Sequence, residues 1–421
     1  MPASSLRLRL AVILSFWWCA AVAQQTAAAP LRLADAVARA VEHYPAVIAA
    51  QRQSDQAQAA VALRRTDALP DVRWTAQFDR ATDNNTPGLL LGNGLPTISG
   101  PVAAHYAWQG YTTSSGGAVL SWEAYDFGRR AAGVDFYRQL SLRSQEQVRE
   151  TQLEVGAHAA DVYLAMLAAG QSVALAAADV ERWRTLDRLV HVLVDQQLRP
   201  GADGSRIDAE LAAAELALAR ANDELARQQA ALAEAVGAPL ETMTLAGEDL
   251  LARAPDEDGG VNGTALGGTP PLDAAPLLRA QQFIIRATQA NQRQLRLSDR
   301  PRFSLLASGY GRGTSLLAGT RLLPDWNGIA PIGAGNWLLG LGVEYSLTRH
   351  WQNKHEQAIA QQQLLQDQAR LTQLQGTLQL AERQAQADLV AARQGLRVAP
   401  VELTAAETSE AQARARYAAG L

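Results

Sequence analysis

The residues of this 421-residue chain that could do chemistry are its six histidines, its acidic runs and its glycine-rich segments. His350 and His355 are five residues apart, whereas two metal ligands on one helical face are three or four apart. The acidic run 256–260 lacks the alternating ligands of a calcium loop, so we interpret it as a solvated linker. The glycines of 309–313 end a strand pattern with no helix after them, which excludes a phosphate loop. We therefore expect no catalytic residue, no cofactor, no metal site and no enzyme activity.

The N-terminus has the features of an export signal. Arg7 and Arg9 precede an apolar run, residues 10–18, that is too short to cross a bilayer as a helix. The sequence Ala-Val-Ala at 21–23 is an A-x-A cleavage site, which predicts a signal peptide over residues 1–23. An uncleaved anchor is the alternative.

Composition narrows the class of protein further. Hydrophobic residues make up 48% of the chain and charged residues 19%, which predicts a folded chain. The net charge of −4 gives no reason to expect a nucleic-acid partner. The single cysteine, Cys19, excludes an intrachain disulfide, and its lipidation would require a small residue where Trp18 stands. Because no later run of about 18 apolar residues occurs, we expect no transmembrane helix, and export leaves a soluble periplasmic protein or a β-barrel.

The chain repeats one plan twice. Pro45 and Pro70 are 25 residues apart, as are Pro276 and Pro301. After each second proline come an alternating segment, a loop rich in Gly, Pro, Asn and Thr, a second alternating segment and a long helical stretch. The match in order across these elements predicts two tandem repeats.

Four segments alternate between apolar and polar residues, the pattern of a strand with one apolar face. They cover about residues 71–80, 117–126, 302–310 and 337–347, each long enough to cross a bilayer as a tilted strand. The apolar positions that we expect to face lipid are Trp74, Phe78, Leu120, Trp122, Leu339 and Leu341. Four strands cannot close a barrel, so we expect three copies to pool their strands.

Long helices fill most of the remaining sequence. We expect them at about 31–69, 127–198 and 205–237 in the first repeat and from 349 to 420 in the second. Leucine recurs every seventh residue in the third helix, which indicates a coiled coil; the positions are Leu211, Leu218, Leu225 and Leu232. Gly237 should end that helix, and Pro400 should interrupt and kink the last one.

Four segments carry a resemblance to a known family. Residues 33–37, Leu-Ala-Asp-Ala-Val, together with His-Tyr-Pro at 43–45, resemble its first helix and Asn-Pro-like step. Residues 121–130, Ser-Trp-Glu-Ala-Tyr-Asp-Phe-Gly-Arg-Arg, resemble its strand-to-helix signature. Residues 201–211 resemble its periplasmic helix–turn–helix tip, and 232–239 its Leu–Gly–x–Pro helix end. In this order they resemble the TolC-like outer-membrane efflux family.

The resemblance covers about residues 31–421 and implies an α+β fold. Long helices would form a coiled-coil barrel, and four strands per chain would contribute to a trimeric transmembrane β-barrel. The first repeat would occupy residues 24–240, a linker 241–270 and an incomplete second repeat 271–421. The chain would be located in the outer membrane of a Gram-negative bacterium, with a long periplasmic extension.

The resemblance also implies a function and partners. The chain would be the channel subunit of a tripartite efflux or type I secretion system, a passive conduit for small molecules, metal ions or proteins. Its partners would be two further copies of itself, outer-membrane lipid, a periplasmic membrane-fusion adaptor and, through that adaptor, an inner-membrane pump. Tip residues that would meet the adaptor are Gly201, Asp203, Ser205 and Asp208, although Ser205 or Asp208 could serve only as a helix N-cap.

Departures from the family pattern keep other interpretations open. The turn 200–207 is one residue longer than usual, and the junction 345–349 lacks the usual glycine-rich form. No helix after Gly420 matches the one that follows Gly201, so a non-functional fragment or a degenerate gene is one alternative. A soluble periplasmic structural coiled coil is another, but it leaves the amphipathic strands unexplained.

Overall fold

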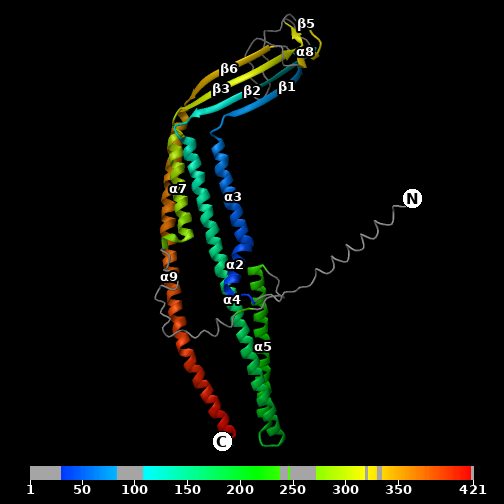
Figure 1. Cartoon of the computed structure of the whole chain (residues 1–421), viewed down its shortest axis with the longest axis vertical. Helices are drawn as coiled ribbons and strands as arrows, with labels where there is room; N and C mark the ends of the chain where they lie inside the picture. Colours follow the sequence, from blue (N-terminus) through cyan, green and yellow to red (C-terminus); the bar gives the residue numbers. More distant parts are fainter. Residues whose placement is uncertain are drawn as a thin grey trace, which may run out of the picture. The chain divides into compact units, whose positions relative to one another are not determined.

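The computed structural model describes residues 30–82, 108–237, 245–246, 272–317, 321–329 and 334–418 (Figure 1). The expected signal peptide, Cys19 and nearly all of the expected linker 241–270 lie outside these residues. The chain divides into two compact units. One consists of Met1–Ser54, Ser144–Arg279 and Gln375–Leu421, and the other of Asp55–Arg143 and Ala280–Leu374.

A four-stranded antiparallel sheet is the main β structure of the second unit (Figure 1). Its strands, in spatial order, are β1 (Asp71–Ala81), β2 (Tyr111–Tyr125), β3 (Arg302–Thr314) and β6 (Ala334–Glu344). The four expected strands are therefore confirmed. Two of them begin earlier than predicted, at Tyr111 and Ala334, because residues without clear alternation are still held by ladder pairs to their neighbours.

Three small elements accompany the strands. β4 (Leu316–Leu317) and β5 (Arg321–Leu322) pair with each other, and the short helix α8 (Trp326–Ile329) follows them. The Asp325 carboxylate accepts hydrogen bonds from Arg80 at 3.0 Å and from the Thr112 hydroxyl at 3.3 Å. These bonds tie the start of α8 to the ends of β1 and β2.

Six long helices make up most of the described chain. They are α2 (Leu33–His43), α3 (Pro45–Thr66), α4 (Arg129–Asp195), α5 (Gly201–Val236), α7 (Pro276–Leu297) and α9 (Leu347–Ala418), and a 3-10 turn, Leu272–Ala274, precedes α7. The helix expected over 31–69 is broken at Tyr44, whose backbone is extended, because a residue before proline avoids the helical region. With 67 residues, α4 is about 100 Å long.

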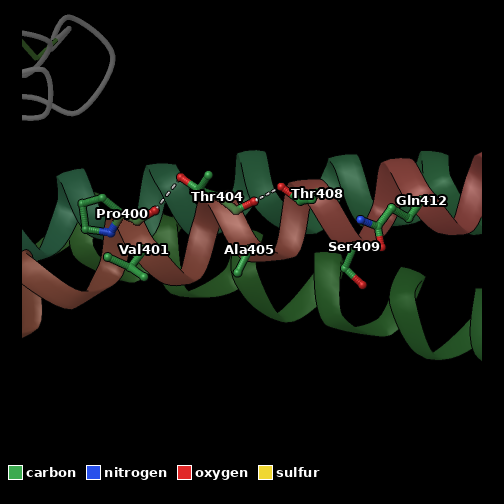
Figure 2. Close-up of a pocket in the computed structure, with 7 residues that line it drawn as sticks. All are labelled: Pro400, Val401, Thr404, Ala405, Thr408, Ser409 and Gln412. Atoms are coloured by element: carbon green, nitrogen blue, oxygen red, sulfur yellow. Dashed lines mark hydrogen bonds between the residues drawn. The ribbon is translucent and has the colours of Figure 1, made fainter.

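Proline does not interrupt α9. The helix continues across Pro400, so the expected interruption is wrong, and the kink stays a prediction. Threonine hydroxyls bond back to the preceding turn: Thr404 donates to the Pro400 carbonyl at 2.9 Å and Thr408 to the Thr404 carbonyl at 2.7 Å (Figure 2). A shallow pocket on this face is lined by α9 alone, by Pro400, Val401, Thr404, Ala405, Thr408, Ser409 and Gln412 (Figure 2).

Helices α2, α4 and α5 share the core of the first unit. Tyr163 of α4 is fully buried there, and its hydroxyl donates to the Leu31 carbonyl at 2.9 Å. Around it lie Leu31, Ala36, Val162, Met166, Leu232 and Val236. A second cluster holds Ala40, Val47, Val155, Ala159 and Ala235, and the predominance of small side chains lets the helix axes approach closely.

Among the described residues, α4 is the one helix long and apolar enough to cross a membrane by length and composition. This helix has no unbroken apolar run of about 18 residues, so it meets the criterion on the composition of a window and the expectation of no transmembrane helix stays a prediction. Val162, Tyr163 and Met166 of α4 are buried against α2 and α5, as in the core helix of a bundle. Packing against α2 and α5 therefore accounts for these three side chains, whereas 28% of the 18-residue apolar window is buried in all.

Buried polar contacts join α7 to α9 within the second unit. The Gln292 amide donates to the Ala360 carbonyl at 3.0 Å, and the Thr288 hydroxyl donates to the Asp367 carboxylate at 2.7 Å. The Asn353 amide donates to the Leu295 carbonyl at 2.8 Å. Each bond requires one register of α7 on α9, since a buried polar group that loses its partner costs about 1–3 kcal/mol.

The junction between β2 and α4 is organised by Asp126. Its carboxylate accepts hydrogen bonds from the backbone N–H groups of Gly128 at 3.1 Å and Arg130 at 2.7 Å, and from the Arg130 side chain at 3.0 Å. Burial raises the pKa of Asp126, but these bonds and the positive charge of Arg130 outweigh burial and lower the pKa below its ordinary value. The ring of Phe127 meets Tyr125 edge-on, with centroids 4.8 Å apart.

We expect Gly237→Ala to lower the free energy of unfolding by about 1 kcal/mol. Gly237 ends α5 with φ of +67°, as the sequence predicted, and its N–H bonds back to the carbonyls of Ala233 and Glu234. Nothing lies within 4 Å of an added Cβ, so backbone strain alone sets the cost. Gly170→Ala is the control, because Gly170 lies inside α4 with equal space around it, and alanine should stabilise it by up to about 1 kcal/mol. Thermal unfolding followed by circular dichroism measures both, and equal effects would contradict the strain argument.

We expect Asp126→Asn to destabilise the protein by about 1–3 kcal/mol at pH 7, because the carboxylate loses charge-assisted bonds. The folded-state pKa of Asp126 is lowered, so its contribution is complete above the ordinary carboxyl pKa and disappears as the pH falls through the lowered value. The difference between wild type and variant should therefore narrow in acid. Asp179→Asn is the control, since Asp179 and Arg182 form an exposed ion pair within α4, and such pairs contribute little to stability. If the difference in the free energy of unfolding between wild type and Asp126→Asn does not change with pH, this account is wrong.

Candidate functional site

The register of the sheet places all six predicted lipid-facing residues on one face. Directly opposed residues in antiparallel strands share a face, and Leu120 is opposite Val72 on one side and Ala307 on the other. Ala307 is in turn opposite Leu339, and Trp122 continues through Leu305 to Leu341. Trp74 is 73% exposed and Leu341 is 86% exposed, which for large apolar side chains indicates a surface that something other than water covers.

The opposite face of the sheet is polar on its edge strand β1. Arg73, Thr75, Gln77 and Asp79 alternate there with the apolar residues. Within this sheet, β1 and β6 each pair on one side only, so the backbone groups on their outer sides have no ladder partner in the described chain. An apolar face and two open edges suit a surface that adds further strands in an apolar medium.

The second candidate site is the hairpin of α4 and α5. The N–H groups of Gln197 and Leu198 bond to the carbonyls of Val194 and Leu193, which closes α4 with Gln197 in the left-handed region at φ of +60°. Two pairs across the hairpin, Arg184–Glu215 at 3.1 Å and His191–Asp208 at 2.9 Å, are symmetric about the bond between Arg199 and Pro200. The two arms are therefore in one defined antiparallel register.

Helix α5 begins earlier than the sequence suggested. Its first residue is Gly201 and its N-cap is Pro200, so the expected start at 205 is wrong. Proline at this position is extended, with ψ of 146°, and makes no side-chain cap. The later start was predicted because Ser205 and Asp208 are residue types that commonly cap a helix. Neither of them is the N-cap of α5.

The predicted tip residues accordingly lie in the first turns of a helix. Asp203 is in the first turn and pairs with Arg199 at 3.4 Å, which puts a carboxylate near the positive end of the helix dipole. Gly201, Ser205 and Asp208 are all exposed, and Asp208 lies further along the helix, where it contacts His191 of α4.

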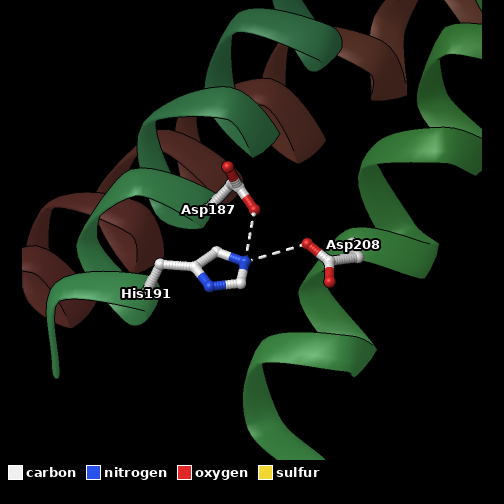
Figure 3. Close-up of side chains that lie close together, drawn as sticks. All are labelled: Asp187, His191 and Asp208. Atoms are coloured by element: carbon white, nitrogen blue, oxygen red, sulfur yellow. Dashed lines mark hydrogen bonds and ion pairs between the residues drawn. The ribbon is translucent and has the colours of Figure 1, made fainter. Parts of the chain in front are cut away.

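Asp208 belongs to a cluster that the sequence analysis missed. Its Oδ1 lies 2.9 Å from Nε2 of His191, and Oδ1 of Asp187 lies 3.3 Å from the same nitrogen (Figure 3). The hydrogen bond to Asp208 raises the pKa of His191 above its ordinary value, desolvation opposes it, and the charges of Asp187 and Asp195 add to the rise. The spacing of four residues from Asp187 to His191 was a visible signal, but the partner across the turn required the hairpin register.

Comparisons with known proteins agree with the fold described above. The family model described as "Outer membrane efflux protein" matches residues 36–238 and 272–421. The comparison with curated protein sequences found no match.

Solved structures of similar fold are membrane proteins at low sequence identity. A structure of CusC, in a study of folding and transmembrane channel formation, is 17% identical with a TM-score of 0.68 and covers 92% of this chain and 82% of its own. The outer membrane protein VceC from Vibrio cholerae is 16% identical with a TM-score of 0.66, covering 92% and 86%. A membrane protein from Pseudomonas aeruginosa is 20% identical with a TM-score of 0.66, covering 92% and 81%.

The family model spans far more than half of the chain, and the sheet and paired helices agree with the fold of these structures. Channel proteins rather than enzymes make up this family, which is consistent with the expected lack of catalysis. The chain belongs to the outer membrane efflux protein family, and it is an outer-membrane channel protein with a long helical periplasmic extension.

Proposed function

We propose that three copies of this chain form a passive channel across the outer membrane. A periplasmic adaptor and an inner-membrane pump drive export through it, and the cargo is small molecules, metal ions or proteins. The observation that carries the proposal is the four-stranded sheet, which has one apolar face and two open edges. A soluble periplasmic coiled coil would have no use for such a surface.

The open edges argue for the trimer. Backbone groups in hydrocarbon must all be paired, so β6 of one copy pairs with β1 of the next. Four strands from each of three copies give a barrel of twelve, wide enough for a lumen. Closed cyclic symmetry is the usual form of such assemblies.

The apolar face argues for contact with lipid. Trp74 and Trp337 lie in one register row, with Ala118 and Gly309 between them. Aromatic side chains also gather where the strands join the helices, at Tyr125, Phe127 and Phe303. Aromatic residues at both ends of an apolar band are typical of strands that cross an outer membrane.

The α4–α5 hairpin is the part of the chain that we assign to adaptor contact. Its turn, residues 196–200, joins two arms held in register by ion pairs. Gly201 and Ser205 present small exposed positions beside Asp203, which suit close approach of another coiled coil.

Arginine at Leu341 should destabilise the inserted barrel by about 2–4 kcal/mol, if this residue lies near the bilayer midplane. The matched control is Leu338→Arg, because Leu338 is on the same strand but on the opposite face of the sheet. It should cost much less. Heat-induced dissociation of the detergent-purified trimer, followed by gel mobility, compares the two variants. Equal loss of stability would show that the lipid-facing assignment is wrong.

Cysteine at Ala202 should form a cross-link to the adaptor in cells, because Ala202 is exposed at the start of α5. Ala230→Cys is the control, since Ala230 is also exposed but lies much further along the same helix. Cross-linking with a short thiol reagent, followed by mass spectrometry of the trapped partner, gives the result. No trapped adaptor from an assembled channel would contradict the assignment of the tip.

A further inference from the structure

We propose that Asp187, His191 and Asp208 form a binding site for a divalent metal ion of the Zn²⁺ class, which cross-links α4 to α5. The two acids and the imidazole converge from both arms of the hairpin (Figure 3). The proposal does not depend on the cargo, the adaptor or the number of copies in the channel.

The spacing of the ligand atoms is close to that of a tetrahedral site. Asp187, His191 and Asp208 each offer one ligand atom, and the three atoms lie within 4.8 Å of one another. Bonds to zinc of about 2.0–2.1 Å place neighbouring tetrahedral ligands roughly 3.3–3.4 Å apart. The distances from Nε2 are 3.3 Å to Asp187 and 2.9 Å to Asp208. A shift of about half an ångström in Asp208 would bring its distance from Nε2 to the tetrahedral value.

The donor set selects the class of metal. One imidazole nitrogen and two carboxylate oxygens are ligands that zinc accepts, with the fourth position left to water. Calcium requires six to eight oxygen ligands, and copper(I) prefers thiolate or thioether sulfur, which this cluster does not offer.

The local charge also favours a cation. Besides its two ligand carboxylates, the cluster has Asp195 one turn further along α4, close enough to act on His191. Two arginines of the same stretch pair with other acids: Arg184 with Glu181 and Glu215, and Arg199 with Asp203. The Nε of Arg188 donates to the Arg184 carbonyl at 3.2 Å. A divalent ion would neutralise the two ligand carboxylates at once.

Gly204 gives the imidazole its place between the helices. A Cβ added at Gly204 would lie 3.3 Å from Cε1 of His191 and 3.6 Å from Nδ1. Gly204 is buried in the second turn of α5, where glycine is a poor helix former. The close approach of α5 therefore keeps the ring of His191 against the two carboxylates.

Zinc binding to the full chain, purified in detergent without a histidine tag, tests the site. Titration against a zinc-sensitive dye should give one strong site per chain, and His191→Gln or Asp208→Asn should weaken it at least tenfold. The matched control is Asp223→Asn, which removes a carboxylate of α5 that pairs with Arg227. It should leave the affinity unchanged. The same affinity in all variants would show scattered surface binding and overturn the proposal.

Cobalt(II) and Gly204→Ala give a second test. Cobalt in the wild-type protein should show the intense visible bands of a tetrahedral site, and these should be lost in His191→Gln. Gly204→Ala should weaken zinc binding, because the added Cβ displaces the ring of His191. It should leave the stability of helix α5 unchanged or raise it. Absence of tetrahedral bands from the wild type, or full zinc affinity in Gly204→Ala, would contradict the geometry proposed here.

Discussion

Backbone pairing at the edges of the β1-β2-β3-β6 sheet is the constraint on which the rest of the structure depends. A peptide group left unpaired in hydrocarbon costs several kcal/mol, so a sheet with one apolar face is stable in a membrane only when both edges find partners. Two strands come from each half of the sequence, and the β2–β3 ladder joins them. In the proposed trimer, the helices that leave this sheet must direct the strands so that neighbouring copies can pair in register.

Two devices hold the helices where they leave the strands. At the first exit, the Asp126 carboxylate binds both the backbone and the side chain of Arg130, which fixes the direction in which α4 starts. Beyond the second, α9 is locked to α7 by buried amide and hydroxyl groups, among them Gln292 and Thr288. Both devices use polar bonds in protected positions, where each bond has a single geometry and is worth more than in water.

Features with local signals were predictable from the sequence. The alternation of apolar and polar residues predicted the four strands and their apolar face, and Gly237 predicted the end of α5. The start of α5 was misplaced because Pro200 acts through its own backbone and not through a capping side chain. The contact of Asp208 with His191 could not be predicted, because it requires the register of the α4–α5 hairpin. The predicted turn was too long, since α5 was expected to start at residue 205. Likewise, the local sequence does not predict the bond from Asn353 to Leu295, since it forms only when α7 and α9 have packed.

The five-residue turn between α4 and α5, residues 196–200, limits how this region can change in length. Adding one residue inside α5 before Asp208 would rotate the rest of the helix by about 100° about its axis and move it about 1.5 Å along α4. Asp208 would then leave His191, Glu215 would leave Arg184, and apolar residues of α5 would turn towards water. Matched insertions of seven residues at facing positions of both arms keep the remaining side chains opposite one another, because seven residues are close to two full turns. Single-residue insertions within either arm should therefore be poorly tolerated, whereas matched heptad-sized changes in both arms should lengthen or shorten the hairpin and keep its remaining contacts.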